Sequence, residues 1–118
     1  MKFAVVGSRN ITDYELVKSI LLQYNITHIV SGGAKGIDIL SEQYADENNL
    51  PKTIFKPEYD KYGKAAPFIR NKQIIDEAEC VIAIWDGKST GTKHSIGICQ
   101  KQHKPLYVWN HNAEIIIL

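Results

Sequence analysis

Short β-branched apolar runs alternate along the chain with stretches of helical periodicity, and this alternation constrains the fold more than any other feature. The runs that predict strands are residues 2–7, 27–31, 52–56, 80–85 and 105–109. The helical stretches between them are at about residues 12–24, 36–48, 67–78 and 92–102. Alternating strands and helices imply right-handed crossovers and a parallel sheet covered on both faces. We therefore predict an α/β protein, a Rossmann-like three-layer α/β/α sandwich whose parallel sheet of about five strands has the order 3-2-1-4-5.

Length and composition fit a single globular domain that covers residues 1–118. The chain is 44% hydrophobic and 23% charged, which is enough apolar material for one core. No apolar stretch approaches the roughly 20 residues that span a bilayer, and the N-terminus is too short for a signal peptide. We therefore expect a cytoplasmic protein without membrane contact. Cys80 and Cys99 fall in a predicted strand and a predicted helix, and we expect both to be buried free thiols.

Charge and histidine spacing limit the classes of partner. The formal net charge of +1 argues against a strong non-specific grip on nucleic acid, which usually needs a pronounced basic face. The basic residues in the connections after the predicted strands are numerous enough to bind a small anion. The four histidines lack the spacing of metal ligands, so we predict no metal site.

Three local features carry further expectations. Thr12 followed by Glu15 predicts a capping box at the start of the first helix. Residues 58–67 form a polar loop of a length that is often functional in compact domains. The apolar tail within residues 111–118 is either an extra edge strand or a subunit contact of a homo-oligomer, and the sequence leaves both alternatives open.

Two glycine-rich turns follow predicted strands and precede predicted helices, which is how a chain builds a phosphate cradle. They are residues 31–38, Ser-Gly-Gly-Ala-Lys-Gly-Ile-Asp, and residues 86–92, Asp-Gly-Lys-Ser-Thr-Gly-Thr. Glycine lets the backbone approach an anion, and the following helix directs free N–H groups at the same spot. Gly7-Ser8-Arg9 adds a hydroxyl and a guanidinium after the first strand. With the predicted strand order, these segments converge at the carboxyl edge of the sheet.

The predicted site combines these turns with two residues near the start of the third helix. Gly, Ser and Thr residues would bind phosphate, and Arg9 and Arg70 would neutralise its charge. Asp38 would cap a helix or accept a hydrogen bond from a ribose hydroxyl. Simple capped turns, an Arg9–Asp13 pair and a solvated Arg70 are the alternatives. The predicted ligand-binding residues are Gly7, Ser8, Arg9, Ser31, Gly32, Gly33, Ala34, Lys35, Gly36, Asp38, Arg70, Asn71, Asp86, Gly87, Ser89, Gly91 and Thr92.

In this order, from Phe3 to about Val108, the motifs resemble those of the SLOG superfamily, and most of all its small YpsA-related members. The segments that carry the resemblance are residues 7–9, 31–38, 61–67, 70–71 and 85–92. The resemblance implies a Rossmann-like fold and a site for a nucleotide or a nucleotide-derived ligand such as ADP-ribose or NAD.

Two branches of the superfamily imply different functions. Residues 31–38 are similar to the Ser-Gly-x-Ala-x-Gly-Ile-Asp signature of the DprA/Smf proteins, which implies single-stranded DNA binding. Residues 87–95 resemble the Gly-Gly-x-Gly-Thr-x-x-Glu motif of the LOG phosphoribohydrolases, and Arg70 matches their catalytic arginine. Here Ser95 stands at the position of the catalytic glutamate, and Lys88 replaces one of the paired glycines.

Ser95 cannot supply the carboxylate that hydrolysis of an N-glycosidic bond requires. If the chain is such a hydrolase, Arg70 and Asp38 are the candidate catalytic residues, with Asp86 or Glu58 as other sources of the acid. We therefore expect a binding module for a nucleotide or an ADP-ribose/NAD-like ligand, acting as a sensor or accessory protein without a required cofactor. A nucleotide N-glycosidase of LOG type and a single-stranded DNA-binding protein of DprA type are the alternatives.

Overall fold

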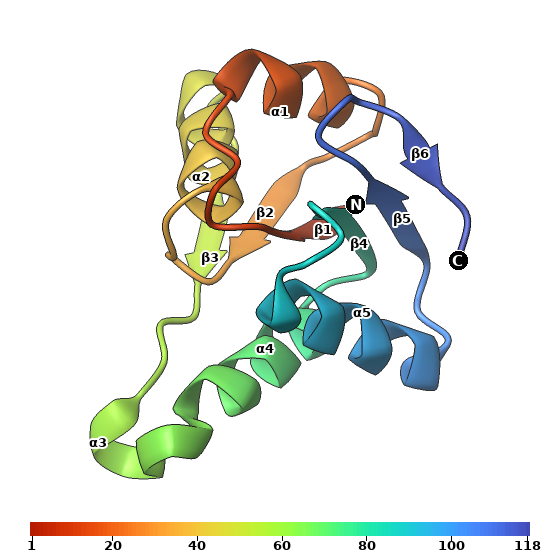
Figure 1. Cartoon of the computed structure of the whole chain (residues 1–118). Coiled ribbons are helices and arrows are strands. Elements are labelled where there is room, and N and C mark those ends of the chain that lie inside the picture. The colour runs from red at the N-terminus through yellow and green to blue at the C-terminus, as the bar shows by residue number, and fades with distance from the viewer.

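A computed structural model describes all residues, 1–118, as one six-stranded sheet between two layers of helices (Figure 1). The strand order is β3-β2-β1-β4-β5-β6. Strands β1 to β5 pair in parallel, and β6 pairs antiparallel with β5. The strands are β1 Lys2–Gly7, β2 His28–Ser31, β3 Lys52–Ile54, β4 Cys80–Ile84, β5 Leu106–Trp109 and β6 Ile115–Ile116. The predicted fold class and the order of the five parallel strands are confirmed.

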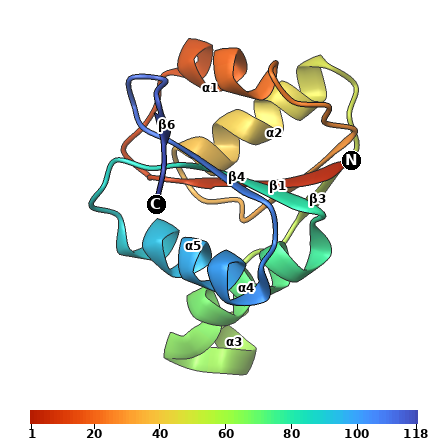
Figure 2. The same ribbon diagram turned by 90° about the vertical axis from the view of Figure 1, so that its right-hand side faces the viewer.

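Helices cover both faces of the sheet, as Figure 2 shows with α1 and α2 above it and α4 and α5 below. The helices are α1 Tyr14–Leu21, α2 Ile37–Glu47, α3 Tyr59–Tyr62, α4 Ala66–Glu77 and α5 Thr90–Gln102, with a 3₁₀ turn at Gly63–Ala65. Each face has its own apolar core: Val17 and Ile20 of α1 are fully buried on one side, and Ile75 of α4 on the other. Every residue of β4 is buried, as expected for a strand between two parallel neighbours.

The structure differs from the sequence predictions in two connections. Asp13 is the N-cap of α1, because its carboxylate accepts a hydrogen bond from the Leu16 N–H at 3.3 Å, so the predicted capping box on Thr12 is wrong. The segment predicted as a polar loop, residues 58–67, contains α3 and the 3₁₀ turn. Helix α4 then begins at Ala66, with a proline in its first turn.

The C-terminal segment forms the edge strand that was one of its two predicted alternatives. Val108 of β5 pairs with Ile116 of β6, while Ile117 remains 93% exposed. The homo-oligomer stays a prediction. Cys80 and Cys99 are buried free thiols, as predicted. No helix has both the length and the apolar character required to cross a membrane.

Candidate functional site

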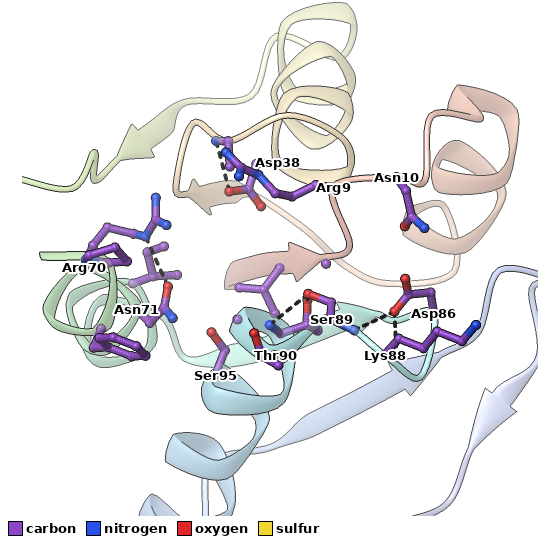
Figure 3. Close-up of a pocket in the computed structure, with 18 of the residues that line it drawn as sticks. Arg9, Asn10, Asp38, Arg70, Asn71, Asp86, Lys88, Ser89, Thr90 and Ser95 are labelled. Carbon is purple, nitrogen blue, oxygen red and sulfur yellow. Dashed lines mark hydrogen bonds between the residues drawn. The ribbon is translucent and has the colours of Figure 1, made fainter. Parts of the chain in front are cut away.

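A crevice of about 740 Å³ lies at the carboxyl edge of the sheet, beside the ends of β1 and β4 (Figure 3). The strand order reverses between these two strands, which is where ligands bind in open α/β sheets. Elements far apart in the sequence contribute its walls. The predicted residues that line it are Gly7, Arg9, Ala34, Asp38, Arg70, Asn71, Asp86, Ser89, Gly91 and Thr92.

Gly36 brings the first glycine-rich turn against the loop after β1. Its φ is +80°, and a Cβ built there would lie 2.5 Å from the Ser8 carbonyl oxygen and 2.6 Å from that of Arg9. The same Ser8 carbonyl accepts hydrogen bonds from the N–H groups of Ile11 and Ile37. Only glycine fits this backbone conformation and this close approach. Gly36 therefore allows the first glycine-rich turn to pack directly against the backbone of the loop after β1.

Asp38 closes the same turn from the first turn of α2. Its Oδ2 accepts a hydrogen bond from the Ala34 N–H at 3.2 Å, and the residue is only 8% exposed. Burial raises the pKa of Asp38 to about 6, although the Ala34 N–H and the Arg70 guanidinium oppose the shift. A carboxyl group with this pKa can change its charge within the pH range of ordinary buffers.

Arg70 links α4 to the glycine-rich turn. Its Nη1 donates to the Gly32 carbonyl at 2.8 Å, and its Nε donates to Asn71 Oδ1 at 3.1 Å. A Cβ at Gly32 would lie 2.8 Å from both Arg70 Nη1 and Asp38 Oδ2. The Asn71 amide in turn pairs with Nδ1 of His94 on α5 at 3.1 Å. The solvated-face alternative for Arg70 is therefore wrong, and the guanidinium is held in place at the side of the crevice.

The second glycine-rich turn is held by Asp86 and Ser89. Asp86 Oδ1 accepts hydrogen bonds from the Lys88 and Ser89 N–H groups, both at 2.8 Å, and these bonds lower the pKa of Asp86. Ser89 is the N-cap of α5 and accepts from the Thr92 N–H at 3.4 Å. The Asp86 N–H donates to Ser8 Oγ at 3.0 Å, which ties the ends of β1 and β4 together. The N-terminus of α5 is thereby fixed at the crevice, where helix N–H groups favour anions.

The remaining predicted residues do not line the crevice. Ser8 is fully buried behind the wall as an acceptor for Asp86, and Ser31 donates to the Glu42 carboxylate at 2.9 Å. Gly33 has a φ of +70° and faces Ile54 and Lys56 instead. The full set outside the lining is Ser8, Ser31, Gly32, Gly33, Lys35, Gly36 and Gly87.

Several lining residues were not in the predicted set. Tyr59 of α3 is 60% exposed and Phe68 of α4 is 55% exposed. The Phe68 ring meets the His94 ring edge-on, with centroids 5.0 Å apart at 82°. Ser95 is buried in the lining and offers a hydroxyl there. The additional lining residues are Val6, Asn10, Tyr59, Pro67, Phe68, Ile74, Lys88, Thr90 and Ser95.

The charged groups of the crevice are of both signs. Arg9, Arg70 and Lys88 line it together with Asp38 and Asp86. The ion pairs of the structure join other residues, so Arg9 is not paired with an acid. No three His, Cys, Asp or Glu side chains gather closely enough to hold a metal ion. The crevice can therefore attract an anion only through local contacts with these cationic side chains and with the α5 N-terminus.

Comparisons with known proteins support the fold. Residues 1–55, which include β1 to β3 and the first glycine-rich turn, match the family described as DNA recombination-mediator protein A. Among solved structures, the chain matches one of DNA processing protein A from Helicobacter pylori, with 30% identity and a TM-score of 0.68. The chain is similar to DNA processing protein A.

The match extends over 92% of this chain and 65% of the DNA processing protein A chain. That structure is described as giving insights into a single-stranded DNA binding mode of the H. pylori protein. No curated protein matches the sequence. The likeness therefore covers nearly all of the present fold, and about two thirds of the other chain.

Proposed function

We propose that this chain binds single-stranded DNA across the crevice at the carboxyl edge of its sheet. The observation that carries the proposal is a rim of exposed aromatic rings beside the cationic side chains of the crevice. Aromatic stacking platforms next to positive grooves are the means by which proteins hold single strands without reading their sequence. The similarity to DNA processing protein A, whose H. pylori structure is described in terms of single-stranded DNA binding, supports the same assignment.

Phe68 is the main stacking candidate. It lines the crevice, more than half of its surface is exposed, and its ring is supported edge-on by His94. Asn71 holds His94 in turn, so the platform is fixed before a base arrives. Tyr59 exposes a second ring on the same rim. Preformed aromatic surfaces of this kind lose little conformational freedom on binding.

Arg9, Arg70 and Lys88 are the candidates for phosphate contacts. Arg9 is exposed and forms no ion pair, and Arg70 is already oriented by two hydrogen bonds. Three phosphate contacts on a single strand give a slope of roughly −2 for the logarithm of affinity against the logarithm of salt concentration. A fourfold rise in salt should therefore weaken binding roughly fifteenfold.

Fluorescence anisotropy with a labelled oligothymidylate tests the proposal. Wild-type protein should bind at low salt with the slope given above, and Phe68→Ala should weaken binding roughly tenfold, because one stacked base is lost. Leu22→Ala is the matched control, since Leu22 is an equally exposed apolar residue at the end of α1. Absence of binding at low salt, or equal affinities of Phe68→Ala and Leu22→Ala, would contradict the proposal.

A free nucleotide is the second candidate ligand. The crevice volume of about 740 Å³ falls within the usual range for small-molecule sites. The same cationic groups would hold the phosphates of a nucleotide, ADP-ribose or NAD. Calorimetry against these compounds separates the two candidates: tight binding of a mononucleotide that is not displaced by an oligonucleotide would favour the small ligand.

Hydrolysis of such a ligand would need an acid other than Ser95. Asp38 lines the crevice and has a pKa raised by burial, so it is the carboxyl group best suited to exchange a proton there. Release of free base from nucleoside monophosphates, lost in both Asp38→Asn and Arg70→Ala, would establish an enzyme. If the wild-type protein releases no free base, only the binding role remains.

A further inference from the structure

We propose that the crevice continues into a second subsite that takes the base of the neighbouring nucleotide in the same strand; this inference rests on the proposed function. A second hollow, of about 500 Å³, adjoins the crevice on the α1 side. The two hollows share Asn10, Asp86 and Lys88 as lining residues. The two hollows therefore meet at these three residues, with Phe68 lining the first hollow and His111 lining the second.

The lining of the second hollow suits a planar base. Ile11 is buried and Leu16 is partly buried, so they provide apolar surface. Asn10, Thr12 and His111 are exposed around it and offer hydrogen-bonding groups. Apolar walls with a few polar groups at the edges are the usual composition of sites for small aromatic ligands.

The charge of the second hollow argues for a base there in place of a phosphate. Asp13 and Asp86 both line it, together with Lys88 as its one lysine or arginine side chain. Asp13 is committed to the α1 N-cap, and Asp86 to the N–H groups of the second glycine-rich turn. Two fixed carboxylates disfavour an anion but tolerate a neutral base.

Lys88 lies at the junction, where the phosphate that joins two nucleotides would pass. Its side chain is exposed and forms none of the ion pairs in the structure. In Figure 3 it extends away from Thr90 and Ser95, toward the side on which Asn10 lies. An ammonium on the wall between two base subsites can contact the linking phosphodiester without entering either one.

Affinity as a function of strand length tests the second subsite. Anisotropy would be measured with oligothymidylates of one to eight nucleotides on wild type, Thr12→Trp and Asn25→Trp. Thr12→Trp fills the second hollow, whereas Asn25→Trp places the same ring on an exposed residue outside both hollows. We expect Thr12→Trp to weaken binding of the longer strands roughly tenfold, which is the affinity that one stacked base contributes. The affinity for the shortest strand should not change.

Lys88→Ala provides a second, independent test of the subsite. Its charge-matched control is Lys101→Ala, because Lys101 is an exposed lysine in the last turn of α5. Lys88→Ala should reduce the salt slope for strands of two or more nucleotides by about 0.7 and should not change it for a mononucleotide. Equal affinities of Thr12→Trp and Asn25→Trp for all lengths, or a length-independent effect of Lys88→Ala, would overturn the second subsite alone. Failure of the wild type to bind any strand would instead refute the proposed function, and the second subsite with it.

Discussion

Replacing Gly36 by alanine should break the contact between the first glycine-rich turn and the loop after β1. Gly36 has φ +80° and ψ −129°, a conformation that costs a non-glycine residue about 1–3 kcal/mol. The new Cβ would also lie 2.5 Å from the Ser8 carbonyl oxygen, a backbone atom that cannot rotate away. Overpacking adds about 1–3 kcal/mol, so we expect a loss of roughly 4 kcal/mol of unfolding free energy.

Two further glycines separate these contributions. Gly87 has φ +82° with nothing within 4 Å of a built Cβ, so Gly87→Ala reports the cost of a positive φ without a steric clash. Gly97 lies in α5 with equally open space and no positive φ, so Gly97→Ala should stabilise the protein by up to about 1 kcal/mol. Urea unfolding followed by circular dichroism gives all three values. If Gly36→Ala is no more destabilising than Gly87→Ala, the packing argument for the turn is refuted.

Two other substitutions test buried polar groups of the site. Because folding raises the pKa of Asp38 from 3.8 to about 6, the folded state binds a proton that the unfolded state has released, and stability falls as pH rises through this window. Between about pH 4 and pH 7, urea unfolding should show that the wild type loses roughly 2 kcal/mol of unfolding free energy that Asp38→Asn does not lose. Parallel pH profiles of the two proteins would exclude this role. Ser8→Ala should lower the unfolding free energy by about 1–3 kcal/mol, because the Asp86 N–H loses its acceptor. Thermal unfolding against Ser19→Ala, an exposed serine on α1, checks this value, and equal melting temperatures would contradict it.

The sheet was predictable because each parallel strand carries its own signal. Buried runs such as the one in β4 are uniformly apolar, and the glycine turns mark where strands end and helices begin. The sequence did not distinguish Thr12 from Asp13 as the α1 cap, since both residue types can accept the hydrogen bond. Helix α3 has only four residues, too few for an apolar period to appear.

The sequence predicted the residues of the site that lie in the glycine-rich turns better than the aromatic residues at its rim. Parallel strands bring their carboxyl ends together, so Gly7, Asp38 and Asp86 could be assigned to one crevice from order alone. Phe68 and Tyr59 reach it only because α4 packs against β1 and β2 and α3 packs against α4, which is a tertiary arrangement without a local signal. Which glycines pack against backbone, and which face the crevice, likewise depends on distances between loops.

Photocrosslinking tests the central claim, that a single strand lies in the crevice, most directly. Wild-type protein bound to an oligonucleotide with a photoreactive thymidine analogue would be irradiated, digested and mapped by mass spectrometry. We predict crosslinks to the segment containing Tyr59 and Phe68, or to residues 86–95, with yields that fall as salt is raised. Crosslinks confined to the exposed faces of α1 and α2, with none at the crevice, would contradict the assignment of this edge of the sheet.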